Sequence, residues 1–141
     1  YFMMGLSAGY HNLDDFRSGK RPCGANETFW LEQEERMFAI FKKVIALGLL
    51  PVCGTDAGTG GTRFDETWLE LALMVRRGCL SARDAIRIGT AQSAACLGLT
   101  RETGAIGEGL SADLIALETD PITCIEALAH PARVMAQGRL V

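Results

Sequence analysis

Apolar residues repeat at helical spacing in one long segment of the first half of the chain. Over about residues 28–47 the steps of three and four residues place one apolar face on a helix, formed by Met37, Ile40, Phe41, Val44 and Leu47. Glutamates lie early in this segment and lysines late, which suits the helix dipole, and Gly48 ends it. The pattern therefore predicts a helix over about 28–47, with the charged run 32–36 as its solvated face.

Two apolar runs flank that helix and have the character of buried strands. The run that begins at Leu49 has no polar alternation and stops at the polar pair Thr55–Asp56, which is typical of a strand in a parallel sheet, buried on both faces. Residues 1–8 predict another buried strand. Residues 9–27 between them predict a long loop, of a length often seen in functional lids and binding loops.

Further helices follow the second strand. A helix is expected over about 65–77, with Trp68, Ala72 and Val75 on one face. The segment Ser81–Asp84 is a capping box that starts a short helix through residue 88, and Thr90 is expected to cap another helix that ends at Gly98. The order strand, helix, strand, helix predicts a parallel α/β sheet.

The sequence pattern changes after residue 100. Glycines punctuate short segments, strands are expected at 114–117 and 133–136, and a turn at 137–138 leads into 139–141. This pattern predicts two parts, an α/β part over residues 1–100 and a β-rich part over residues 101–141.

Composition narrows the classes of function. A chain of 141 residues with 48% hydrophobic and 22% charged residues is typical of a folded globular domain. A net charge of -3 without a basic run gives no electrostatic support for binding nucleic acid or an anionic membrane. No apolar stretch approaches the roughly 20 residues of a membrane span.

The five cysteines do not form a recognisable framework. They lie at positions 23, 53, 79, 96 and 124, and none belongs to a CxxC motif, which argues against a zinc ribbon and against a disulfide scaffold. Buried, reduced thiols in a cytoplasmic protein are the expected arrangement; one exposed, reactive cysteine is the alternative.

The candidate chemistry centres on Asp56. This carboxylate follows a predicted parallel strand and precedes a glycine-rich loop at 58–62, and parallel α/β folds bind ligands at the carboxyl ends of their strands. A side chain that only caps the next turn explains the residue equally well. Spacing alone does not choose between a site residue and a turn residue.

Two further residues are candidates for substrate binding. His11 lies in the predicted loop after the first strand, and Arg63 follows the glycine-rich loop, where its guanidinium could bind a substrate carboxylate through two hydrogen bonds. A solvated loop histidine and a surface arginine are the commoner roles for such residues. The other histidine, His130, is expected to lie far from the site.

The residues around Asp56 resemble a known family motif. The stretch 54–58, Gly-Thr-Asp-Ala-Gly, resembles the eighth-strand motif of the amidohydrolase superfamily, in its imidazolonepropionase-, prolidase- and dipeptidase-like branch. Similar blocks follow in the family's order, at 70–71, 77–86, 90–98 and 104–115, and the segments 120–121 and 134–138 complete the pattern. The resemblance covers residues 49–141 and, more weakly, 1–48.

The resemblance implies a fold and a chemistry. Residues 1–100 would be the C-terminal portion of a (β/α)8 TIM barrel, about strands 7–8 with their helices, and residues 101–141 the terminal strands of a small β-sandwich domain. The implied activity is hydrolysis of a C–N bond in a cyclic or peptide-like small-molecule substrate. Asp56 would contact a divalent metal, zinc in the implied assignment, and move a proton between water and the leaving amine.

The resemblance also shows what the chain lacks. The family's His-x-His pair and its other ligands have no counterpart, since His11 and His130 are the only histidines. A complete barrel takes about 250 residues. We therefore expect an isolated chain to be inactive and to need a missing N-terminal part. The alternatives are a non-catalytic module that assembles as a homo-oligomer through its sheet edges, and a truncated reading frame.

Overall fold

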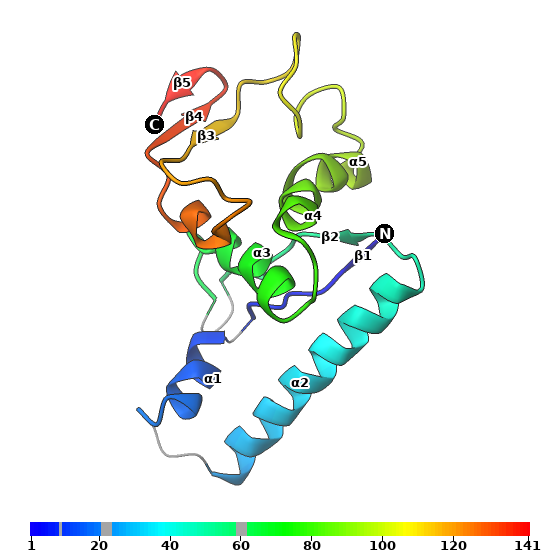
Figure 1. The fold of residues 1–141 in the computed structure, drawn as a ribbon, viewed down its shortest axis with the longest axis vertical. Coiled ribbons are helices and arrows are strands. Elements are labelled where there is room, and N and C mark those ends of the chain that lie inside the picture. Colours follow the sequence, from blue (N-terminus) through cyan, green and yellow to red (C-terminus); the bar gives the residue numbers. More distant parts are fainter. Residues whose placement is uncertain (9, 21–23, 59–61) are drawn as a thin grey trace.

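The computed structural model describes residues 1–8, 10–20, 24–58 and 62–141, which form an α/β structure (Figure 1). The first half contains β1 (Phe2–Met3), α1 (Tyr10–Arg17), α2 (Ala25–Ala46) and β2 (Pro51–Val52). It is followed by α3 (Thr67–Arg76), α4 (Ala82–Arg87), the π-helical turn η1 (Ile88–Gln92) and α5 (Ser93–Leu97). The last part contains β3 (Leu114–Ala116), the 3-10 helix η2 (Ile125–Ala129), β4 (Arg133–Ala136) and β5 (Arg139–Leu140). Most of the predicted loop 58–62, and Cys23, lie outside the described residues.

The strands form two separate small sheets. Strands β1 and β2 pair in parallel, with Phe2 beside Pro51 and Met3 beside Val52, so the predicted parallel arrangement is confirmed although each strand has only two residues. Strands β3, β4 and β5 form an antiparallel sheet in that order, at the opposite end of the molecule from α2 (Figure 1). The predicted strands of the C-terminal part are thus confirmed.

Helix α2 forms nearly where expected, but its buried stripe coincides with only part of the predicted apolar face. Phe38 and Phe41 are buried, whereas Ile40 and Leu47 of the predicted apolar face are 53% and 71% exposed. Each residue of an α-helix advances by about 100°, so the predicted face is rotated from the true one. Glu34, which lies one turn before Phe38, belongs to the buried stripe, and the prediction of a solvated charged run is wrong at this residue.

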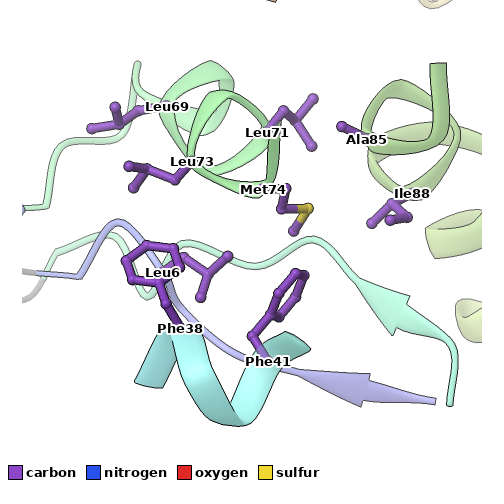
Figure 2. Packing of buried hydrophobic residues seen from close by; sticks show 9 residues of the cluster. All are labelled: Leu6, Phe38, Phe41, Leu69, Leu71, Leu73, Met74, Ala85 and Ile88. Atoms are coloured by element: carbon purple, nitrogen blue, oxygen red, sulfur yellow. The ribbon is translucent and has the colours of Figure 1, made fainter. Parts of the chain in front are cut away.

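The core lies between α2, α3, α4 and the chain that follows β1 (Figure 2). Its buried members are Leu6, Phe38, Phe41, Leu69, Leu71, Leu73, Met74, Ala85 and Ile88. Helix α3 is buried through six consecutive residues, 69–74, so the single face predicted for it is too narrow. Of that predicted face, Ala72 is buried while Trp68 and Val75 are half-buried. Burying each large apolar side chain stabilises the fold by about 1.5–3 kcal/mol.

A helix occupies part of the segment predicted as a loop over 9–27. Helix α1 spans Tyr10–Arg17. The guanidinium of Arg17 lies 5.8 Å from the centre of the Tyr10 ring and forms an ion pair with Glu34 of α2. The ion pair joins residues that are distant in sequence, so the pattern of positions 9–27 alone could not indicate it.

The predicted boundary between the later helices is partly wrong. Ser81 caps α4 as expected, because its Oγ accepts a hydrogen bond from the backbone N–H of Asp84 at 3.1 Å. Thr90, however, caps nothing. It lies inside η1, and its hydroxyl donates to the carbonyl of Ile86 at 2.7 Å. One helical segment with a π-turn therefore replaces the two helices expected here.

The environment of the cysteines differs from the expected burial. Cys79, Cys96 and Cys124 are exposed and Cys53 is half-buried, so buried thiols are the wrong description for three of the four described cysteines. The run before Cys53 is also less buried than predicted, since Leu49 and Leu50 are 50% and 45% exposed.

In the described part of the chain, no helix combines the length and the apolar character needed to cross a membrane.

Candidate functional site

Asp56 lies just beyond the carboxyl end of β2 and is exposed. Its backbone φ is 56°, in the left-handed region that residues other than glycine rarely adopt and that is often found at functional sites. The neighbouring Gly54 packs against β1, because an added Cβ there would collide with Met3 Sδ. The chain that follows β1 runs alongside: an added Cβ on Gly5 would lie 3.6 Å from the carbonyl oxygens of both Gly54 and Thr55. Both strands therefore end at one edge, where Asp56 emerges.

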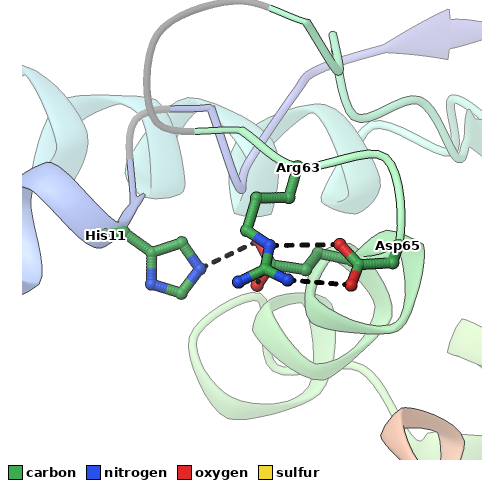
Figure 3. Close-up of polar contacts among 4 residues, drawn as sticks. His11, Arg63 and Asp65 are labelled. Carbon is green, nitrogen blue, oxygen red and sulfur yellow. Dashed lines mark hydrogen bonds and ion pairs between the residues drawn. The ribbon is translucent and has the colours of Figure 1, made fainter.

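The two residues predicted to bind substrate contact one carboxylate. His11 Nε2 lies 2.9 Å from Glu66 Oε2, and Arg63 Nε lies 3.7 Å from Glu66 Oε1. Arg63 also donates to both carboxylate oxygens of Asp65, at 3.2 and 3.0 Å (Figure 3). This pairing raises the pKa of Arg63 and lowers that of Asp65. Asp56 is not among the four residues joined by these contacts.

A groove of about 640 Å³ extends from this polar cluster to the C-terminal part. It is lined by Arg63, Glu66 and Trp68 and, from the C-terminal part, by Glu126 and His130. His130, which was expected to lie far from the site around Asp56, lines this groove together with Arg63, a candidate for substrate binding. This proximity was not predictable from local patterns, because more than 60 residues separate the two positions.

Glu70 holds the chain that follows β1. Its carboxylate is fully buried and accepts hydrogen bonds from the backbone N–H of Leu6 at 2.9 Å and of Ser7 at 2.8 Å. Burial raises the pKa of Glu70 to about 7, while the two backbone donors act in the opposite direction. Glu66 precedes it by one helical turn, so both carboxylates at the start of α3 hold the β1–α1 region. The sequence did carry a signal: a lone acid within the apolar stretch 68–74 indicates a buried, partnered carboxylate.

Cys53 does not have the character of a nucleophile. Burial, and secondarily the charge of Glu70, raises the pKa of its thiol to about 12, so the thiol stays protonated at neutral pH and is a poor nucleophile.

The described residues do not fit a complete metal site. No group of three or more His, Cys, Asp or Glu side chains in residues 1–8, 10–20, 24–58 and 62–141 is arranged to hold a metal ion. A catalytic zinc site takes about three protein ligands. Asp56 can supply one oxygen donor, and further donors would have to come from elsewhere.

Comparisons with known proteins place this geometry in a family. The model of the amidohydrolase family matches residues 32–141, and the chain belongs to that family. Over 95 residues, 67% of the chain, it is 35% identical to ochratoxinase from Aspergillus niger, of which it covers 19%.

Solved structures agree. A crystal structure of a putative prolidase from Bifidobacterium longum superposes with a TM-score of 0.80 and 32% identity, over 99% of this chain and 34% of that one. A Xaa-Pro dipeptidase with methionine bound in its active site gives a TM-score of 0.70 and 31% identity, over 77% of this chain and 26% of that one. The chain thus spans between about a fifth and a third of the length of these relatives.

Proposed function

We propose that a complete protein containing this chain hydrolyses a C–N bond in a cyclic amide or peptide-like substrate. The observation that carries the proposal is the position of Asp56, exposed at the shared carboxyl edge of two parallel strands in an amidohydrolase-family chain. Relatives named as a prolidase and a Xaa-Pro dipeptidase support a peptide-like substrate.

In this proposal the chain is the C-terminal part of the enzyme. Residues 1–100 correspond to about strands 7–8 of a (β/α)8 barrel with their helices, β1 and β2 being the two strands. Residues 101–141 correspond to the terminal strands of a small β-sandwich, which the separate β3–β4–β5 sheet supports. A cytoplasmic location and a homo-oligomeric state stay predictions.

Asp56 would act as a metal ligand and as a proton carrier. A divalent metal, zinc in our proposal, supplies Lewis-acid activation of water when bound. The residues of this chain could hold only one corner of such a site, through the Asp56 carboxylate. That carboxylate would accept a proton from the water whose oxygen attacks the carbonyl carbon. It would then deliver this proton to the leaving nitrogen, so that the amine departs neutral.

His11 and Arg63 would contact the substrate. Both side chains are accessible, with 47% and 66% of their side-chain surfaces exposed. Arg63 would exchange Asp65 for a substrate carboxylate with the same two-pronged geometry. His11 would present the edge of its ring that does not face Glu66.

The test is Asp56→Asn in the complete protein, assayed against Xaa-Pro dipeptides and N-acyl amino acids. We expect kcat to fall by at least about 10²–10⁴, with an unchanged circular dichroism spectrum. Glu118→Gln, which removes another exposed carboxylate, is the matched control and should retain full kcat. Full activity of Asp56→Asn would refute the proposed role.

A further inference from the structure

Side chains from a helix bind the edge of β2 that faces away from β1. Strand β1 takes one edge, where the N–H of Phe2 donates to the carbonyl of Leu50 at 3.0 Å. Successive backbone groups of a strand point to opposite edges, so Pro51 and Cys53 face the other way. There the Gln92 amide nitrogen donates to the Pro51 carbonyl, and Ser93 Oγ accepts from the Cys53 N–H at 3.1 Å.

The two side chains come from the end of the π-helical turn η1. Ser93 Oγ donates in turn to the carbonyl of Ile88 at 2.6 Å, so its hydroxyl is used both as acceptor and as donor. The other amide atom of Gln92, its Oε1, accepts from Arg87 at 3.4 Å. Gln92 is only 9% exposed, and each of its polar ends therefore has a partner, as a buried amide requires.

The π-turn is what directs these residues at β2. A π-turn inserts one residue into a helix and is frequent at functional sites. In a regular α-helix the residues after Gly89 would be turned by about 100°, away from their present contacts with Pro51 and Cys53. The π-turn has a less favourable hydrogen-bond geometry than an α-helix, but it allows the two hydrogen bonds to Pro51 and Cys53.

We propose that Gln92 and Ser93 are positioning residues for Asp56. They bind the β2 backbone at Pro51 and at Cys53, which lies three residues before Asp56; Asp56 itself adopts a φ of 56°. The proposal rests on the proposed function of Asp56 in proton transfer. A small displacement of a reacting group can lower a rate by about 10²-fold, so the two bonds would act on kcat through Asp56 without touching the substrate.

The test uses three variants of the complete protein and one control. Ser93→Ala removes the hydroxyl and introduces a residue of high helix propensity. Gln92→Glu keeps shape but replaces the donor to Pro51 by an acceptor. Ser93→Thr restores a hydroxyl. The matched control, Thr90→Ala, breaks the hydroxyl bond to Ile86 in the same turn and leaves the bonds to β2 intact.

We expect Ser93→Ala and Gln92→Glu to lower kcat by roughly 10- to 100-fold with KM unchanged within about twofold. Ser93→Thr and Thr90→Ala should retain the original kcat. Hydrogen exchange followed by mass spectrometry supplies a second measurement: the peptide that contains residues 51–56 should exchange faster in the first two variants only.

The outcomes separate the inference from the function on which it rests. Unchanged kcat in Ser93→Ala and Gln92→Glu, in a protein that Asp56→Asn inactivates, would overturn the inference alone. Faster exchange without loss of kcat, or a rise in KM alone, would likewise overturn it and leave a purely structural role. An active Asp56→Asn protein would instead overturn the proposed function.

Discussion

His11 Nε2 and Glu66 Oε2 lie 2.9 Å apart although 55 residues separate them in sequence. The contact joins α1 to the N-cap residue of α3 and orients the imidazole ring. Because nearly half of the His11 side-chain surface is exposed, this hydrogen bond contributes little to stability, about 1 kcal/mol or less.

We therefore predict that His11→Ala separates stability from substrate binding. In the complete protein KM should rise roughly tenfold through loss of a substrate hydrogen bond, while the free energy of unfolding changes by less than about 1 kcal/mol. Steady-state kinetics and urea unfolding check the two values. Lys20→Ala, an exposed change just after α1, is the control. An unchanged KM in His11→Ala would remove His11 from the substrate site.

The burial of Glu70 predicts that the stability of the fold depends on pH. Its pKa is about 7 in the folded chain against a reference value of 4.5. Between these values the folded state binds more protons than the unfolded state, so the Glu70 contribution to stability is largest below pH 4.5 and is lost as pH rises to about 7. At 1.36 kcal/mol for each pKa unit, the loss is ~3 kcal/mol.

The measurement is urea unfolding of the wild type and of Glu70→Gln at several pH values between 4 and 8. Subtracting the two curves removes the pH dependence of stability that the two proteins share. The thiol of Cys53, with a pKa of about 12, stays neutral throughout. The wild type should lose stability relative to Glu70→Gln as pH rises through this window. Parallel curves would show that Glu70 does not titrate there. Glu108→Gln, an exposed change, is expected to follow the wild-type curve.

Glu34 makes a prediction about the contact between α1, α2 and α3. Its Oε2 pairs with Arg17 and lies 2.7 Å from Arg77 Nη1, and the Arg77 guanidinium stacks 4.1 Å from the Phe38 ring centre. Removing one partner of a buried pair leaves the others uncompensated and costs roughly 3–5 kcal/mol. Both arginines are partly exposed, so we expect Glu34→Ala to cost about 3 kcal/mol.

Glu35→Ala is the matched control for that variant. Glu35 also pairs with Arg77, but its side chain is 71% exposed, and its loss should cost less than about 1 kcal/mol. Thermal unfolding of both variants checks the difference. Equal melting temperatures would mean that the Glu34 cluster is no stronger than a surface ion pair.

Much of the fold was predictable where local chemistry decides it. The span of α2, the Ser81 cap, the strands β3 and β4 and the turn that follows β4 agree with the periodicity, capping and turn residues. Helix α1 was not predicted, because its eight residues include four charged or amide side chains and its ion pair reaches Glu34 of another helix. The same contact hid the burial of Glu34, because a charge run looks solvated until its distant arginines are known.

The candidate site shows the same division. Asp56 is recognisable because strand, carboxylate and glycines are neighbours in sequence. Glu66, Gln92 and Ser93 are not, because their partners His11, Pro51 and Cys53 lie 40 or more residues away. Their roles became visible only when the fold brought these segments together.

The π-turn at Ile88–Gln92 also has a meaning for insertions and deletions. Deleting a single residue from it would let α4 and α5 merge into one regular helix. Ser93 would then rotate by about 100° about the helix axis. Its Oγ would no longer accept the hydrogen bond from the Cys53 N–H. Most helices accept a one-residue deletion poorly because their whole buried face shifts. Here the deletion would leave a regular α-helix, and its effect would be the loss of side-chain hydrogen bonds to the neighbouring strand β2. The number of residues in this turn therefore decides whether the edge of β2 is bound.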